Sequence, residues 1–346
     1  MSQPSEPTPS SFSHDLTAKS IFAEPEAARD LVVLLAAREC PELWSWTPVR
    51  LVAVTADPER HPPQAEGHRD LVWELARDDD ADRMLLHLEF QSQRDANMSE
   101  RMFLYALRMS PSLRGLEVCG VVVNTGIDRF GEWRSPVQAV AGVRRYGFRT
   151  GALLEIHDHV VPGLEGGAHA LPPDNLASGF VALARVQAEM ARGRRAAAAL
   201  VLPVLRELIL PRALGTASSL RRALGAWFKT RFDRLLADQP DLRAALRRIT
   251  YIEEAEAVMY TFGQYVEDEK KDAEARGMAE GEARGKKEIL LAFIRQVWGD
   301  AEADRCAREL DAAALDDLPD IAGLLADQAA GRRPRLGTNG RTGSAA

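Results

Sequence analysis

Two short runs of alternating apolar and polar residues constrain the fold of this chain more than any other feature. Residues 69–76 read RDLVWELA, residues 84–91 read MLLHLEFQ, and the acidic run DDDAD lies between them at 78–82. Successive side chains of a strand point to opposite faces, so this period predicts two half-buried strands joined by a turn. We therefore expect a β-hairpin in the first half of the chain.

The second run carries a carboxylate where strands rarely tolerate one. Glu89 and Gln91 share the face opposite to Leu88 and Phe90, roughly 6.5–7 Å apart along the strand. Glutamate is depleted from strands and is rarely buried without a partner. The hairpin brings Asp70 beside Glu89, and two carboxylates on one apolar face repel unless a cation lies between them. The pattern therefore predicts a Mg²⁺ site formed by Asp70, Glu89 and the backbone carbonyl of Phe90, with Asp70 as a simple strand cap or partner of the preceding arginine as the alternative.

The flanking patterns predict an α/β domain followed by helices. Helical and strand patterns follow the order α-β-β-α-β-β, with helices at 15–22, 25–38 and 99–113 and strands at 69–76, 84–91, 116–124 and 152–160. The predicted regions are a disordered tail (1–13), an α/β domain (14–165), a basic helical region (166–250), an acidic helix and linker with glycine at every fourth position (251–286), a small helical bundle (287–330) and a disordered tail (331–346).

The formal net charge of −7 conceals two opposed blocks. Residues 185–250 hold 14 Lys and Arg against 5 Asp and Glu, a net of +9, and residues 251–330 hold 9 against 20, a net of −11. A basic block attracts the phosphate backbone of nucleic acids, whereas opposed blocks can equally pair with each other or face water. The arginines predicted to bind DNA are Arg192, Arg194, Arg195, Arg221 and Arg222.

Several of these residues together resemble a known family. The runs Asp70–Trp73 and Leu88–Ser92, followed by Met98, Arg101–Met102 and Tyr105, resemble the Rpn family of recombination-promoting nucleases, also described as PD-(D/E)XK nuclease family transposases. The run from His14 to Phe22 resembles the opening segment of that family, and the glycine tetrad with the last helices resembles its accessory region. The resemblance covers most of residues 14–330.

The resemblance implies a PD-(D/E)XK core, a small mixed sheet flanked by helices, followed by an all-helical region. It implies a magnesium-dependent DNA endonuclease linked to recombination or mobile DNA, with Asp70, Glu89, Gln91 and Arg101 as catalytic residues. Gln91 occupies the position where the wider superfamily often has lysine, and an amide orients water but carries no charge. Arg101 and Arg108 are candidates for the missing cation.

Two alternatives remain open. Without the lysine, the chain is either an active enzyme or a catalytically weakened or inactive nuclease-fold protein that binds DNA or assembles with itself. A helical scaffold that forms a homo-oligomer through residues 252–298 is the third hypothesis.

Other residues favour structural roles, and whole classes of protein lack support. A lone His87, the pair His157 and His159 without a partner cluster, Tyr105 in a core, and Lys19 as an anchor of the first helix are the ordinary interpretations. The sequence has no long apolar run, no secretory signal, no zinc spacing among three distant cysteines and no nucleotide-binding motif. These observations predict a cytoplasmic protein without a membrane partner or a nucleotide cofactor.

Overall fold

The computed structural model describes residues 11–52, 71–77, 82–107, 116–131, 133, 135, 148–312, 318–334 and 336. The chain divides into two compact units, Met1–Val266 and Glu267–Ala346, and each is described by itself. Among the predicted site residues, Asp70 and Arg108 lie outside the described residues.

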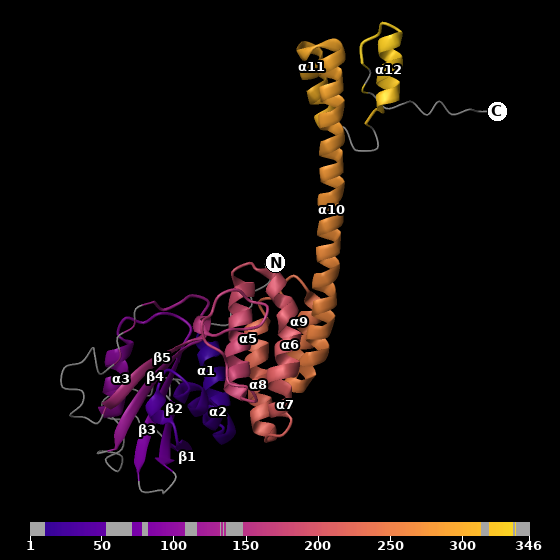
Figure 1. Cartoon of the computed structure of the whole chain (residues 1–346). Helices are drawn as coiled ribbons and strands as arrows, with labels where there is room; N and C mark the ends of the chain where they lie inside the picture. Colours follow the sequence, from indigo (N-terminus) through magenta and orange to yellow (C-terminus); the bar gives the residue numbers. More distant parts are fainter. Residues whose placement is uncertain are drawn as a thin grey trace, which may run out of the picture. The chain divides into compact units, whose positions relative to one another are not determined.

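The first unit contains a five-stranded mixed sheet in the order β1-β2-β3-β4-β5 (Figure 1). The strands are β1 (Trp46–Val52), β2 (Leu71–Arg77), β3 (Arg83–Gln91), β4 (Glu117–Asn124) and β5 (Phe148–Glu155). β1, β2 and β3 pair antiparallel, whereas β3, β4 and β5 pair parallel. The expectation of an α/β chain with a small mixed sheet flanked by helices is confirmed.

β1 is the strand that sequence patterns did not predict. It is an edge strand, it contains Pro48, and its register against β2 shifts between Pro48 and Arg50. Proline cannot donate to a ladder, so within sheets it is confined to edges and bulges, and a shifted register breaks the alternation on which strand prediction depends.

The two faces of the sheet are covered by different helices (Figure 1). Leu88 and Phe90 of β3 lie in the main core with α1 (Ser11–Phe22) and α2 (Pro25–Ala36). On the other face, α3 (Met98–Leu107) packs Met98 and Met102 against Val122 of β4. α3 is the crossover between the parallel strands β3 and β4, which cannot be joined by a tight turn.

The remaining elements of the described residues are helical. In the first unit they are η1 (Pro41–Leu43), η4 (Ile156–Asp158), α5 (Leu176–Ala191), η5 (Arg195–Leu200), α6 (Val201–Val204), η6 (Leu205–Ile209), α7 (Leu210–Ala213), α8 (Ser218–Phe232), α9 (Pro240–Arg248) and η7 (Ile252–Glu254). α10 (Ala255–Trp298) begins in the first unit and ends in the second, which also contains α11 (Asp300–Ala312) and α12 (Ile321–Ala329).

The predicted 14–165 domain and the predicted 166–250 region share one hydrophobic core. Phe22 of α1 stacks on Phe90 of β3 with ring centroids 5.3 Å apart and meets Phe180 of α5 edge-on at 5.0 Å. Phe180 in turn lies 4.6 Å from Trp227 of α8. Because α5 is buried from Leu176 to Met190, its apolar residues surround the whole helix and it forms a central element of this unit.

The second unit has a smaller core of its own. Leu290 and Ile294 of α10 cluster with Ala303, Cys306 and Leu310 of α11 and with Leu318, Leu324 and Leu336. The three glycines spaced four residues apart, Gly277, Gly281 and Gly285, lie within α10 and do not break it. Around each of them, no atom beyond the adjoining turns of the helix lies within 4 Å of where a Cβ would stand. Within the described parts of the chain, no helix combines the length and the apolar character that crossing a membrane requires.

The shared core predicts that the sheet and α5 unfold together. Replacing Phe180 by alanine should destabilise the first unit by roughly 3–5 kcal/mol, the usual cost of deleting a buried aromatic ring. Urea unfolding followed by both circular dichroism and tryptophan fluorescence should give one transition for the first unit, and the substitution should move it to lower urea. Leu214→Ala is the control, because Leu214 is 57% exposed and its loss should matter little. Separate transitions for sheet and helices would contradict this prediction.

Candidate functional site

Glu89 is buried at the carboxyl end of β3, where its charge is compensated by three neighbouring side chains. Its side chain is 3% exposed. Oε2 accepts a hydrogen bond from Lys19 Nζ at 3.0 Å, and Oε1 accepts from Arg101 at 3.1 Å and from Gln91 Nε2 at 2.7 Å. Arg101 also donates to Asp95 at 2.6 Å. The site therefore combines one buried carboxylate, one amide and two cationic groups.

The structure brings three predicted site residues together, and two others, Asp70 and Arg108, lie outside its described part. Glu89, Gln91 and Arg101 are in direct contact, as the period-2 pattern and the following helix suggested. Asp70 is not among the described residues. The side chain of Phe90 is fully buried in the core, so its predicted role concerns the backbone carbonyl alone.

Lys19 is the member of this site that sequence reasoning placed elsewhere. The sequence pattern predicts an anchor of the first helix at this position, but the Lys19 side chain is 13% exposed and its ammonium group reaches Glu89, 70 residues along the chain. The neighbouring Ala18 and Phe22 are fully buried, so α1 holds Lys19 against the end of the sheet. The only sequence feature that could have indicated this role is a lone lysine beside core positions of a helix. The same pattern is typical of a helix edge that faces solvent, so it does not distinguish the two.

The oxygen atoms at this site are of the kind that bind a hard cation. The oxygens of Glu89, the amide oxygen of Gln91 and the carbonyl of Phe90 are the oxygen ligands that Mg²⁺ prefers, and a carboxylate has lone pairs for more than the donors that Glu89 already accepts. Among the described residues, no group of three or more His, Cys, Asp and Glu is placed to hold a metal ion. A magnesium site here therefore needs a further ligand, and Asp70 is the predicted one.

A second polar cluster continues from Gln91 across the parallel strands. Gln91, Asn124 and Glu155 are aligned in register at the ends of β3, β4 and β5. Asn124 Nδ2 donates to both carboxylate oxygens of Glu155, at 2.9 and 3.0 Å. Gly126 N donates to Asn124 Oδ1 at 2.7 Å, and a Cβ at Gly126 would collide with the carbonyl oxygen of Ser92. The turn after β4 is thus packed against the residue that follows Gln91.

Burial shifts the ionisation of this second cluster in opposite directions for its two titratable groups. Desolvation raises the pKa of Glu155, against the lowering effect of hydrogen bonds from Asn124 and from the backbone of Phe130. Desolvation lowers the pKa of His157 to about 4, helped by the positive charges of Arg192 and Arg129. His157 is therefore neutral near pH 7, and its Nε2 lies 4.0 Å from Glu155 Oε1 without a hydrogen bond.

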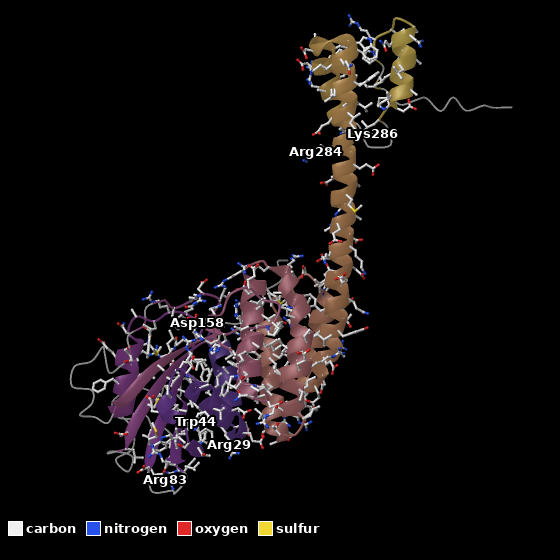
Figure 2. The ribbon with its side chains drawn as sticks, in the orientation of Figure 1. Arg29, Trp44, Arg83, Asp158, Arg284 and Lys286 are labelled. Carbon is white, nitrogen blue, oxygen red and sulfur yellow. The ribbon has the colours of Figure 1, made fainter. Side chains whose placement is uncertain are left out.

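The two histidines of the HDH run are separated by their contacts. His159 is 2% exposed and its Nε2 lies 3.5 Å from Glu39 Oε1, whereas His157 belongs to the Glu155 cluster. Asp158 between them, labelled in Figure 2, is half-exposed and pairs with Arg129. His157 and His159 are thus not directed at one common ligand site.

Each of the arginines predicted to bind DNA has a partner in the structure. Arg192 and Arg194 both pair with Glu189, at 2.8 and 2.7 Å. The other three are held by residues beyond α5: Arg195 lies 3.7 Å from Asp238, Arg221 lies 2.8 Å from Glu253, and Arg222 lies over the Tyr251 ring. The pair formed by Arg221 and Glu253 joins the basic block to the acidic block, as one of the alternative interpretations of the charge pattern proposed.

Comparison with protein-family models, with curated proteins and with solved structures gives no match for this chain. The resemblance to the Rpn family therefore remains a prediction from the residues quoted for it.

The lowered pKa of His157 predicts a loss of stability in mild acid. Between about pH 6.5 and about pH 4 the unfolded chain binds a proton at this histidine that the folded chain excludes, so the free energy of unfolding falls as the pH falls through this window, by up to roughly 3 kcal/mol. A His157→Gln variant should lose that part of the pH dependence, measured by urea unfolding at a series of pH values.

The raised pKa of Glu155 acts in the opposite direction, since a folded carboxyl that binds its proton more readily gains stability as the pH falls. The difference between the parent and His157→Gln isolates the histidine, because Glu155 is present in both. A difference that does not change over the window would contradict the assignment.

Proposed function

We propose that this protein is a magnesium-dependent DNA endonuclease with a PD-(D/E)XK core of the kind that the Rpn-like residues imply. The order of the sheet supports the proposal, since an antiparallel hairpin, β2 and β3, is followed by a helical crossover to a parallel strand. This arrangement sets the carboxylate of β3 at a sheet end beside a helix that supplies a cation.

The proposal rests on the three side chains that donate hydrogen bonds to Glu89. A buried carboxylate is costly to desolvate, and the chain stabilises this one with Lys19, Arg101 and Gln91 instead of replacing it by an apolar residue. Groups with this chemistry, gathered at the end of a strand, are those that a phosphodiester hydrolase needs: an acidic metal ligand, an amide and cations for a phosphate.

Each residue then has a distinct task. Glu89 would hold a magnesium ion together with Asp70, the residue that precedes Leu71, and Leu71 is paired with Leu88. Gln91 would orient the attacking water through its amide. Lys19 and Arg101 would stabilise the negative charge that develops on the phosphate, which is the role that Gln91 cannot fill.

When bound, a magnesium ion supplies Lewis acidity and lowers the pKa of a coordinated water. The protein's own contribution is to hold the donors in place. Lys19 and Arg101 approach Glu89 from two different helices, α1 and α3. A substrate phosphate at this place would compete with Glu89 for the same two cations, so binding of substrate would also make Glu89 available as a ligand.

Replacing Glu89 by glutamine should reduce Mg²⁺-dependent cleavage of supercoiled plasmid and of single-stranded DNA by at least about a hundredfold, because the amide cannot serve as an anionic ligand. Nicking is measured on agarose gels over time with the purified full chain, and circular dichroism checks the fold.

Glu74→Gln is the matched control. Glu74 is also nearly buried on the same sheet and is also held by two arginines, Arg50 and Arg83. Its position on the sheet is different, since Figure 2 places Arg83 at the end of the sheet remote from Asp158. It should retain cleavage if it is folded. Equal loss in both variants, or no Mg²⁺-dependent cleavage by the parent, would overturn the proposal.

Replacing Lys19 by glutamine tests whether this lysine provides the charge that Gln91 lacks. We expect kcat to fall by about one to two orders of magnitude while KM changes less, since the charge matters most when the phosphate becomes more negative. Lys19→Arg should restore part of the rate. Lys229→Gln in α8 is the control for loss of a partly exposed lysine, and an equal rate in all four proteins would remove Lys19 from the mechanism.

A second candidate function has its own supporting observation. The Glu89 carboxylate already accepts hydrogen bonds from Lys19, Arg101 and Gln91, an arrangement that is stable as a purely structural ion-pair network. The chain would then be an inactive nuclease-fold protein that binds DNA or assembles with itself. Salt-dependent DNA binding by the parent without any cleavage would favour this second function.

A further inference from the structure

The main core of the first unit brings two of the three cysteines into contact. The sulfur atoms of Cys40 and Cys119 lie 3.7 Å apart, although 79 residues separate them along the chain. Both side chains are fully buried, and both are thiols in this structure. Sequence spacing alone gave no indication of this contact, because it joins segments that lie far apart in the sequence.

Cys119 is held in position by a central strand of the sheet. In β4 it is aligned with Leu86 of β3 and with Thr150 of β5, so strands pair on both sides of it. Cys119 and Val121 alternate along β4 and belong to the main core, whereas Val122 packs toward α3. The thiol of Cys119 therefore points to the side of the sheet that α1 and α2 cover.

Cys40 lies where the chain turns from α2 into η1. Its backbone N–H donates to the carbonyl of Leu35 at 2.8 Å, and its own carbonyl accepts from the N–H of Leu43 at 2.8 Å. The connection is close to solvent on either side of Cys40, since Pro41 is exposed and Trp44, labelled in Figure 2, is 70% exposed. A local opening of this short connection therefore uncovers the Cys40 thiol while the sheet remains paired.

The separation of the two sulfur atoms is close to the one that a disulfide requires. To form the bond they must move from 3.7 Å to about 2.05 Å. Rotation of each cysteine about its Cα–Cβ bond moves the sulfur while the backbone stays in place. Because the fold already holds both thiols side by side, their reaction is intramolecular and the entropy of bringing the two segments together has been lost on folding.

We propose that Cys40 and Cys119 are a site of oxidative modification, where a small peroxide converts the two thiols into a reversible disulfide. The bond would join the connection after α2 to β4. It would close a loop of chain that contains β1, β2, β3 and α3, and the carboxylate of Glu89 lies within this loop. The proposal does not depend on catalysis at Glu89.

The reaction has two steps, and its atoms balance. The Cys40 thiolate attacks one oxygen of hydrogen peroxide, the O–O bond breaks, and the products are a sulfenic acid at Cys40 and one water. The sulfur of Cys119 then attacks the sulfenic sulfur, the S–S bond forms, the S–O bond breaks, and the oxygen leaves as a second water with the proton of Cys119. In total two thiols lose two hydrogen atoms and one peroxide is reduced to two waters.

The experiment treats the reduced full chain with hydrogen peroxide under native conditions, after the reductant has been removed. The protein is then unfolded in the presence of iodoacetamide, digested with trypsin and analysed by mass spectrometry. We expect the tryptic peptides 39–50 and 115–129 to be joined by a disulfide and to separate after treatment with dithiothreitol. Alkylation of Cys40 and Cys119 to the same extent as in untreated protein, or their oxidation to separate sulfinic acids, overturns the proposal.

Cys306 is a matched internal control. It is also fully buried, but it belongs to the core of the second unit, which contains no other cysteine among its described residues. After peroxide treatment it should still be alkylated, because no second thiol is there to form a disulfide. Cross-links from Cys306 that are as frequent as the bond between Cys40 and Cys119 would show that the reaction occurs in unfolded chains, and they would overturn the proposal.

Urea unfolding followed by circular dichroism tests whether the fold accommodates the bond. A cross-link restricts the unfolded chain, and a long closed loop restricts it more, so we expect the oxidised parent to unfold at a midpoint about 1 M higher than the reduced parent. Peroxide treatment should give no such shift in Cys119→Ala, which also controls for oxidation of methionine, and Cys40→Ala is the second variant of this kind. Cys306→Ala should keep the shift. An oxidised parent that is no more stable than the reduced one would overturn the proposal.

Discussion

The negative charge of Glu89, held almost out of contact with solvent at the end of β3, determines how the surrounding elements are arranged. Desolvating a carboxylate costs several kcal/mol unless cations and hydrogen-bond donors compensate it. Here the compensating charges come from one helix that precedes β3 in the sequence and one that follows it: Lys19 of α1 and Arg101 of α3. α1 is fixed in turn by the Phe22 ring on Phe90 and by the Trp73 indole, which donates to the carbonyl of Phe22 at 2.8 Å. The same helix therefore completes the core and delivers a cation to the site.

The sequence allowed prediction of those features that depend on local periodicity. The alternation of apolar and polar residues identified β2, β3 and the shared face of Glu89 and Gln91, because successive side chains of a strand point to opposite faces of the sheet. It failed at β1, where Pro48 and a register shift break the alternation. It also gave no indication that α5 would join the sheet in one core, since an apolar helix does not reveal which partner buries it. Lys19 and the row from Gln91 to Glu155 were missed for the same reason, as both depend on register between distant segments.

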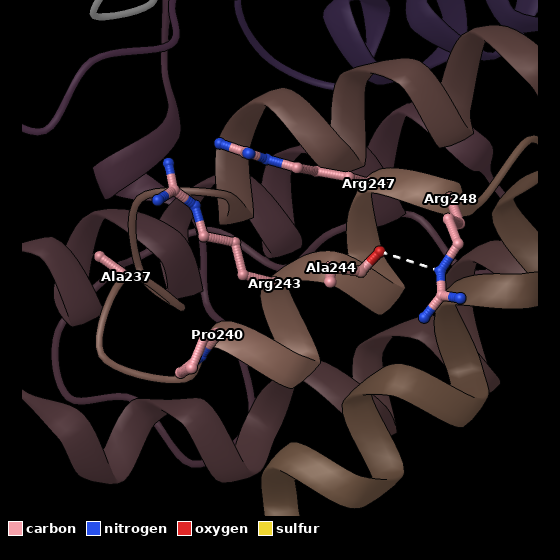
Figure 3. A pocket seen from close by; sticks show the side chains of 6 residues that line it. All are labelled: Ala237, Pro240, Arg243, Ala244, Arg247 and Arg248. Carbon is pink, nitrogen blue, oxygen red and sulfur yellow. Dashed lines mark hydrogen bonds between the residues drawn. The ribbon is translucent and has the colours of Figure 1, made fainter. Parts of the chain in front are cut away.

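The charge blocks show why regional net charge is a poor guide to partners. Residues 185–250 carry an excess of nine positive charges, yet Arg192, Arg194 and Arg221 each hold a carboxylate within 3 Å. The opposite charges of such a pair largely cancel at a distance, and surface pairs of this kind contribute little to stability. On α9 as well, Arg243 and Arg247, both labelled in Figure 3, pair with Asp233, at 2.6 and 2.7 Å. The sequence gives the net charge of a block, whereas only the folded arrangement reveals which of its arginines already hold a carboxylate.

Glu74 and Glu89 together show what separates a structural carboxylate from a candidate ligand. Both lie on the same face of the sheet and both accept from two cationic side chains. Glu74, however, lies within β2 and is paired on either side with Arg50 of β1 and Leu85 of β3, so its arginines lie on adjacent strands. Glu89 lies one residue beyond Leu88, the last β3 residue that pairs with the described part of β2, and its cations come from two helices. Cations borne by helices can exchange a carboxylate for a phosphate without disturbing a strand ladder, and this difference makes Glu89 the stronger candidate for chemistry.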